Sequence, residues 1–295
     1  MFVEPERARF IVVNHTRLRV WEWGDPAAPR VLFLHGGFDH GRMYDDLAPR
    51  LAALGHHATA LDARGHGDSG PLTSGTTWNT QILDLALLTR ELGTPVGIVS
   101  HSIGGGHALS LAAAFPELVR WVVNIDGLGP PEEAMADPDE PSIAMNEELE
   151  RALRILRRPR REFDSLDAMA DQRGKVNIRL PRKWLLHLAE HGSVEGPTGG
   201  RVWKSDPKFS VSLPSPFGYE QLLAQQRMVQ CPVLVLTGDQ PDTWTEINGA
   251  ELAKRVANMA NARHVLVPGT GHYVHIEDPD ATMRAIESFL IDVGP

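Results

Sequence analysis

The stretch of residues 95–116 reads PVGIVSHSIGGGHALSLAAAFP and decides the fold. It begins with a short apolar, β-branched run at residues 96–99, which is typical of a buried strand. It ends with an Ala- and Leu-rich run at residues 107–115, which predicts a helix that stops at Pro116. A strand that passes into a helix over so few residues requires a very tight turn, and Ser102 lies at its apex.

Small residues on both sides of Ser102 allow the strand and the helix to approach each other. The turn has the small-x-Ser-x-small pattern of a nucleophile elbow, with Ser100 in place of the usual first glycine and Gly104 as the second. In such a turn the serine is strained, its hydroxyl is exposed, and the Ile103 N–H favours an oxyanion. The alternative is a glycine-rich turn without chemistry. The pattern therefore makes Ser102 a candidate nucleophile and Ile103 a candidate oxyanion-hole donor.

Composition narrows the class of protein. A chain of 295 residues with 42% hydrophobic content can bury a sizeable core. A net charge of −9 argues against a nucleic-acid partner. The single cysteine, Cys231, forms no intrachain disulfide and fits a reducing compartment. Residues 1–20 carry charges where a signal peptide is apolar, and no apolar run is long enough to span a membrane. We therefore expect a soluble, cytoplasmic protein with no membrane partner.

Apolar runs alternate with helical patterns along both ends of the chain. This alternation predicts an α/β fold with a mostly parallel central sheet that is covered on both faces. The expected strands are residues 10–13, 18–23, 31–34, 58–61, 96–99, 121–125, 232–237 and 264–267, and the expected helices are residues 44–54, 79–92, 107–115 and 281–293.

The alternation stops after residues 126–129. Residues 130–229 are rich in charge, proline and glycine, with helical patterns at residues 147–157, 166–173 and 182–191 and an irregular stretch at residues 195–216. We therefore expect a core of residues 1–129 and 230–295, interrupted by a helical cap at residues 130–229. The arginine-rich run at residues 151–161 is expected to be a solvated helix face.

Four motifs, in this order, resemble those of the α/β-hydrolase-fold superfamily, specifically serine hydrolases with a helical cap. They are His35-Gly36-Gly37, the turn at residues 62–69, the elbow at Ser102, and Gly269-Thr270-Gly271-His272. The likeness extends from about residue 10 to the end of the chain. Within the family, the runs at residues 126–131 and 203–207 resemble a serine-hydrolase-like subgroup.

The resemblance implies roles for further residues. His272 would lie on a loop beside Ser102 and act as its base, since an imidazole has a suitable pKa for proton transfer at neutral pH. Gly37 would supply the second backbone donor of the oxyanion hole. His101 would have a structural role or line the pocket, and would not transfer protons. Aromatic residues of the insertion, Trp184, Trp203 and Phe217, are candidate pocket walls. No metal or organic cofactor is implied.

The acid of the expected triad departs from the family pattern. The family usually places it three residues after the glycine that ends the strand before the last, and Pro241 stands at that point after Gly238. The fold can instead use the end of the strand after the elbow, where Asp126 stands. A carboxylate at that place requires a cationic or N–H partner such as an imidazolium. We favour Asp126 as the acid and keep Asp242 as the alternative.

The expected function is cleavage of a carboxylic ester, or a similarly activated acyl group, through an acyl-enzyme. The expected partner is a small-molecule acyl substrate. A C–C bond hydrolase, an amidase or peptidase, and a cofactor-free perhydrolase use similar residues on the same fold. A non-catalytic relative that only binds a small molecule is the alternative from another class. The sequence determines neither the natural substrate nor the oligomeric state.

Overall fold

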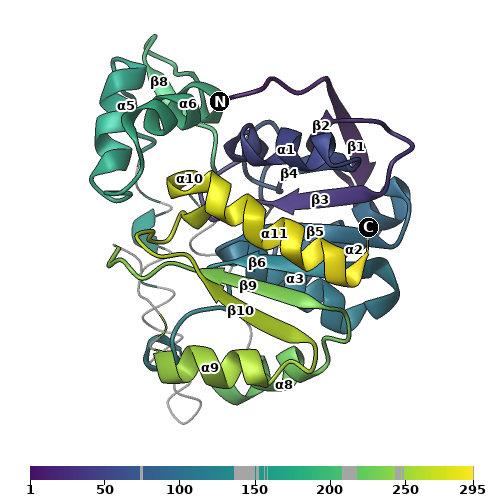
Figure 1. The fold of residues 1–295 in the computed structure, drawn as a ribbon. Helices are drawn as coiled ribbons and strands as arrows, with labels where there is room; N and C mark the ends of the chain where they lie inside the picture. The colour runs from purple at the N-terminus through teal and green to yellow at the C-terminus, as the bar shows by residue number, and fades with distance from the viewer. Residues whose placement is uncertain are drawn as a thin grey trace.

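The computed structural model describes most of the chain: residues 1–73, 76–135, 150, 153–155, 157, 159–207, 218–242, 247 and 249–294. An eight-stranded sheet runs through these residues in the order β1-β2-β4-β3-β5-β6-β9-β10 (Figure 1). The strands are β1 (Arg7–Val13), β2 (Thr16–Trp23), β3 (Arg30–Leu34), β4 (His57–Asp62), β5 (Val96–His101), β6 (Val119–Ile125), β9 (Val233–Thr237) and β10 (Ala262–Leu266). β1 and β2 form an antiparallel hairpin, β2 pairs antiparallel with β4, and the remaining pairs are parallel. The predicted, mostly parallel sheet is confirmed.

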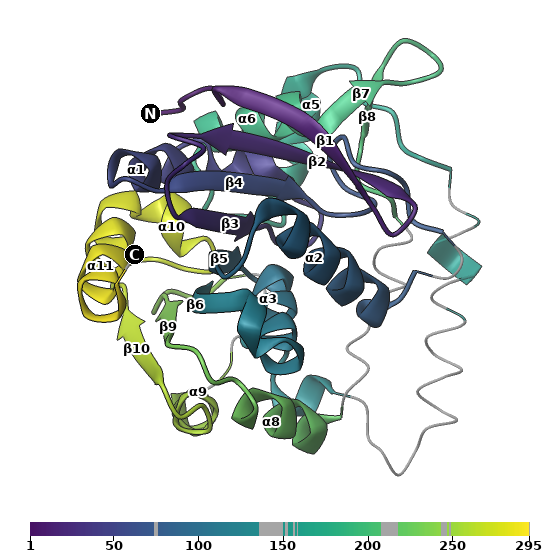
Figure 2. The same cartoon turned by 90° about the vertical axis from the view of Figure 1, so that its right-hand side faces the viewer.

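Helices cover both faces of the sheet (Figure 2). One face carries α1 (Leu47–Ala53) and α11 (Pro279–Val293), and the other carries α2 (Trp78–Leu92), α3 (Ile103–Ala114) and α9 (Gly249–Ala257). The short helical elements are η1 (Gly41–Tyr44), η2 (Pro116–Leu118), η3 (Glu132–Ala134) and α10 (Val274–Glu277). Among the described residues, no helix is both long and apolar enough to span a lipid bilayer.

Strand β3 explains why the central strands are continuously apolar. Val31 and Phe33 face the core under α1 and α11, whereas Leu32 and Leu34 face the core under α2 and α3. All four side chains are buried. Because each face of a parallel sheet is covered, both sets of alternating residues must be apolar.

The turn at Ser102 is tighter than the sequence predicts. β5 continues to His101 and α3 begins at Ile103, whereas the predicted helix begins four residues later. The prediction is wrong because Gly104, Gly105 and Gly106 have low helix propensity. Their small size is required by packing: a Cβ at Gly104 would lie 2.5 Å from the carbonyl oxygen of Leu34, and a Cβ at Gly105 would lie 2.6 Å from that of Gly127.

The region between β6 and β9 is only partly helical. Two of its predicted helices are confirmed as α5 (Leu166–Gly174) and α6 (Arg182–Gly192). The stretch predicted as irregular contributes β8 (Arg201–Trp203), which pairs with β7 (Ser193–Glu195) in a two-stranded antiparallel sheet. The prediction missed this hairpin because its strands are too short for a periodic pattern. The helix predicted at residues 147–157 falls largely outside the described residues.

A further helix of this region, α8 (Tyr219–Arg227), packs on the core helix α3. The Ser110 hydroxyl of α3 donates to Gln225 Oε1 at 3.0 Å, and Gln226 Nε2 donates to the Leu128 carbonyl at 3.3 Å. In Figure 2, α8 lies beside α3 and α9. The boundary of a cap at residues 130–229 remains a prediction.

Residues 159–207, here called the outer segment, lie over the loops at one end of the sheet (Figure 1). Arg173 forms an ion pair with Asp39 in the loop after β3. Further ion pairs with core carboxylates are Arg179–Glu277 at 2.6 Å and Lys204–Asp68 at 2.5 Å. The cations lie on the outer segment and the carboxylates on the core, so electrostatic attraction and packing together hold the segment in place.

Several histidines are part of the core. Burial lowers the pKa of His107 and of His275 to about 3, and the His272 ring adds to the effect at His275. Both ring nitrogens of His275 are buried and hydrogen-bond to none of the described residues. The folded protein therefore keeps these imidazoles neutral at a pH where the unfolded chain takes up protons.

A side chain at Gly104 is expected to destabilise the fold. Gly104→Ala forces a methyl group against the carbonyls of Leu34 and His35, and overpacking of this kind costs about 1–3 kcal/mol. Chemical denaturation measures the loss. Gly249→Ala is the matched control, because a Cβ there meets no heavy atom within 4 Å. Equal stability of the two variants would contradict the packing argument.

Stability is expected to fall as the pH drops from 6.5 toward 3. The unfolded chain protonates His275 near pH 6.5, whereas the folded protein resists protonation down to about pH 3. Each such histidine contributes a slope of about 1.4 kcal/mol per pH unit. His275→Leu removes the contribution of this histidine. The slope of the unfolding free energy against pH should therefore decrease by about 1.4 kcal/mol per pH unit, which corresponds to one proton. The exposed-turn variant His15→Gln serves as a control, and an unchanged slope in His275→Leu would refute the explanation.

Candidate active site

Ser102 joins β5 to α3 in a strained conformation. Its φ is 53° and its ψ is −128°, in the region that residues with a Cβ rarely adopt. The Ser102 N–H donates to the Ile125 carbonyl at 3.0 Å, and the Ser102 carbonyl accepts from the Gly105 N–H at 2.8 Å. These bonds fix the backbone of Ser102 against the end of β6. The backbone of an elbow, as predicted for this turn, is present.

His272 and Asp126 meet at the same end of the sheet. Asp126 directly follows β6, and His272 follows the turn after β10. The distance from His272 Nδ1 to Asp126 Oδ2 is 2.6 Å, and their side chains are 11% and 31% exposed. A charge-assisted hydrogen bond of this length holds the ring with Nδ1 protonated, which makes Nε2 the acceptor nitrogen of the ring.

Asp242 contacts a different part of His272. Its Oδ2 accepts from the His272 backbone N–H at 3.2 Å. Asp239, the other acid near Pro241, accepts from the Gly269 N–H at 2.7 Å. Both carboxylates therefore support the backbone of the loop that carries His272, whereas Asp126 holds the ring.

The loop after β3 lies directly against Ser102. A Cβ at Gly36 would lie 3.2 Å from the Ser102 Cβ. The Ala63 N–H donates to His35 Nε2 at 3.0 Å, so His35 Nδ1 carries the proton and donates to the Gly36 carbonyl at 2.7 Å. This pair of bonds ties the loop to the end of β4.

The backbone amides of the two predicted oxyanion-hole donors differ from that of the neighbouring residue Phe38. The Phe38 N–H donates to His66 Nε2 at 3.3 Å, so this amide is occupied. The N–H groups of Gly37 and Ile103 donate to no acceptor within the described part of the chain. Their lack of a partner in this part of the chain is what an oxyanion-hole donor requires.

His101 supports the backbone of His272. It is fully buried, and its Nε2 donates to the His272 carbonyl at 3.0 Å. Burial, and then His272 and His275, hold the pKa of His101 well below its usual range. A neutral ring in this position fixes the loop without adding charge, and its burial leaves no exposed surface for lining a pocket.

Close to the site lie residues that the sequence analysis did not identify, one of them in the outer segment. Arg173 bonds both Asp39 and the Tyr273 hydroxyl, the latter at 3.3 Å, and Tyr273 follows His272 directly.

The Arg173 guanidinium lies 5.8 Å from the centre of the Trp203 ring. Trp203 is thus near the site, whereas Trp184 packs against Phe2 with ring centroids 4.5 Å apart. Phe217 lies outside the described residues. Of Arg173, Asp39 and Tyr273, only Asp39 carried a signal in the sequence, because it lies just after the His35-Gly36-Gly37 motif.

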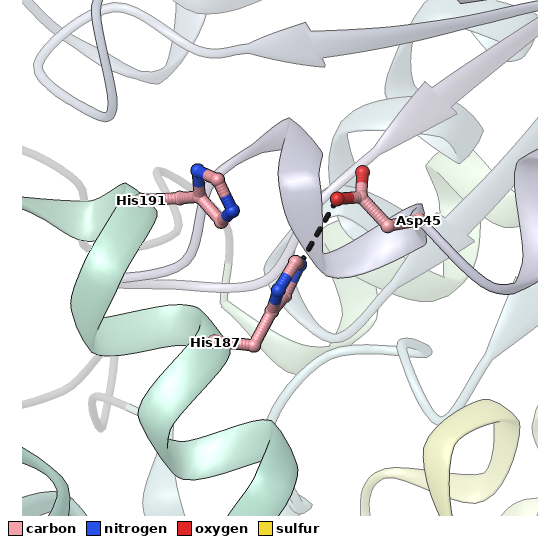
Figure 3. A group of neighbouring side chains, drawn as sticks. All are labelled: Asp45, His187 and His191. Atoms are coloured by element: carbon pink, nitrogen blue, oxygen red, sulfur yellow. Dashed lines mark ion pairs between the residues drawn. The ribbon is translucent and has the colours of Figure 1, made fainter. Parts of the chain in front are cut away.

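Asp45, His187 and His191 form a group whose potential ligand atoms lie within 4.8 Å of one another (Figure 3). This is the one such group among the described residues. Arg42 already supplies its cation: Nε donates to both Asp45 oxygens at 2.9 and 2.7 Å, and Nη1 lies 3.3 Å from His191 Nδ1. His187 Nε2 donates to the Arg42 carbonyl at 3.1 Å and lies 3.0 Å from Asp45 Oδ2. The group links α6 to the core, and the Arg42 guanidinium occupies both Asp45 oxygens.

Comparison with known proteins agrees with the fold. A model of the alpha/beta hydrolase family matches residues 31–285. A probable serine hydrolase of Drosophila melanogaster is 28% identical over 91% of this chain and 82% of its own length. An esterase of Mycobacterium tuberculosis is 28% identical over 91% of this chain and 84% of its own length.

A solved structure, that of E-2-(acetamidomethylene)succinate hydrolase, superposes with a TM-score of 0.79 at 26% identity and covers 99% of this chain and 100% of that protein. The family match extends over most of the chain, from β3 into α11. The chain therefore belongs to the alpha/beta hydrolase family.

Proposed function

We propose that this protein is a serine hydrolase that cleaves carboxylic esters through the triad Ser102, His272 and Asp126. The observation that carries the proposal is the 2.6 Å contact between His272 Nδ1 and Asp126 Oδ2, next to the strained Ser102. The serine hydrolase and esterase among the relatives support it. The names of these relatives describe their own substrates. That this protein acts on esters is therefore part of the proposal.

In the proposed mechanism, His272 Nε2 removes the proton of Ser102 as the hydroxyl oxygen attacks the ester carbonyl. The negative charge on the carbonyl oxygen is stabilised by the N–H groups of Gly37 and Ile103. The intermediate expels the alcohol, which takes the proton from His272. His272 then deprotonates a water that attacks the acyl-enzyme, and the acid leaves as Ser102 regains its proton. Asp126 stabilises the imidazolium that forms in each half-reaction.

The proposed substrate is a small acyl compound that binds between the core and the outer segment. Trp203 is proposed as a wall of this pocket because it lies against Arg173, which in turn contacts Asp39. The cap at residues 130–229 and the cytoplasmic location remain predictions. The proposed steps use only this chain's own residues.

An amide is the second candidate substrate. It is favoured by the likeness to the acetamidomethylene-succinate hydrolase, which extends over nearly the whole of both chains. Acylation of Ser102 by an ester or by an amide uses the same groups, and the leaving group takes its proton from His272 in both cases. Matched ester and amide substrates with one acyl group distinguish the two.

Ser102→Ala is expected to abolish labelling by a fluorophosphonate probe and to remove esterase activity toward p-nitrophenyl acetate, because the attacking oxygen is lost. The fold should remain intact. Ser110→Ala, on the same helix, removes a buried hydroxyl away from the site and should keep labelling. Labelling of the Ser102→Ala protein at wild-type level would refute the assignment.

Asp126→Asn is expected to lower kcat on the order of 10³- to 10⁴-fold with little change in KM, since the carboxylate sets the tautomer of His272. Asp242→Asn should stay near wild type, because an amide oxygen can still accept from the His272 N–H. Steady-state kinetics on one ester measures both variants. A crippled Asp242→Asn with an active Asp126→Asn would reverse the assignment of the acid.

A further inference from the structure

Asp126 has a positive backbone φ, which is uncommon for residues other than glycine. Its φ is 46°, in the left-handed region that residues with a Cβ adopt infrequently. Its side chain is 31% exposed, so burial alone does not fix the carboxylate. The surroundings of the Asp126 backbone must therefore supply the constraint.

The side chain of Asn124 supplies such a constraint. Its Oδ1 accepts from the Gly127 N–H at 2.9 Å, and its Nδ2 donates to the Gly127 carbonyl at 3.2 Å. Asn124 belongs to β6 and is fully buried, so its own backbone is fixed by the sheet. One amide group thus holds both polar groups of the residue that follows Asp126.

The same contacts tie the Asp126 loop to the elbow. A Cβ at Gly105 would lie 2.7 Å from Asn124 Nδ2 and 2.6 Å from the Gly127 carbonyl oxygen. A Cβ at Gly127 would overlap the Ser102 carbonyl oxygen. Asn124 therefore bonds a loop that is packed directly on the backbone of Ser102 and on the first turn of α3.

We propose that Asn124 is a positioning residue that sets the Asp126 carboxylate against His272. It acts through Asp126, at the 2.6 Å contact between Asp126 Oδ2 and His272 Nδ1. The inference rests on the proposed function, since it assigns Asn124 a part in the same reaction. Without the Asn124 amide, the Asp126 backbone relaxes toward the ordinary region and the carboxylate moves away from the ring.

A double-mutant cycle between Asn124→Ala and Asp126→Asn tests this. In the wild-type background, Asn124→Ala is expected to lower kcat for p-nitrophenyl acetate on the order of 10- to 100-fold with KM unchanged, as for a misplaced catalytic group. In the Asp126→Asn background it should cause no further loss, because the group it positions is already gone. The rate of fluorophosphonate labelling should follow the same pattern.

Thr237→Val is the matched control. Thr237 ends the neighbouring strand β9, is buried, and its hydroxyl lies 2.7 Å from His264 Nε2. Its loss removes a partly buried hydrogen bond that the Asn124 and Asp126 side chains do not share, so stability should fall while kcat stays unchanged. If Asn124→Ala does not fold, Asn124→Asp enters the cycle, because it keeps the acceptor for the Gly127 N–H.

The outcomes separate two failures. A loss of kcat by the same factor in both backgrounds, or no loss in either, would overturn the role of Asn124 and leave the proposed hydrolase standing. A wild-type protein that neither reacts with the probe nor turns over esters or amides would overturn the proposed function, and the role of Asn124 with it.

Discussion

The close approach of α3 to the end of β3 is the constraint on which the site depends. Gly104 lies so near the carbonyls of Leu34 and His35 that a Cβ there would clash with both. In the strand-to-helix turn that follows, Ser102 has a positive φ of 53°. Because the Ser102 N–H also bonds the Ile125 carbonyl, the ends of β3, β5 and β6 meet at one point. The loops that leave these strands carry the candidate oxyanion donors, the candidate nucleophile and Asp126.

Neutral histidines hold these loops together. His35 and His66 each bond two backbone groups, and His101 bonds the carbonyl of His272. A neutral imidazole offers one donor and one acceptor, which matches buried backbone groups without the cost of a buried charge. Burial keeps the pKa of His66 and of His101 well below the usual range. The arrangement gives rigidity near neutral pH and links the stability of the site to the protonation of its supports.

The outer segment meets the site through a buried ion pair. Arg173 and Asp39 are both buried, so separating them leaves an unpaired charge, which is far more costly than breaking an exposed pair. The Arg179–Glu277 and Lys204–Asp68 pairs are more exposed and contribute less. The same Arg173 contacts Tyr273, next to His272, and lies over Trp203. Arg173 therefore links the position of the segment to the surroundings of the candidate site.

The sequence by itself determined the sheet, the elbow at Ser102 and the loops that carry His35 and His272, because strands and tight turns are encoded by neighbouring residues. It misjudged the start of α3, where packing against β3 outweighs the low helix propensity of glycine. It missed the β7–β8 hairpin, and it gave no sign of Arg173 or Asn124. Only the tertiary structure decided that the His272 ring meets Asp126 while Asp242 meets its backbone. That choice depends on where loops more than a hundred residues apart in the chain come together, and residue spacing does not encode it.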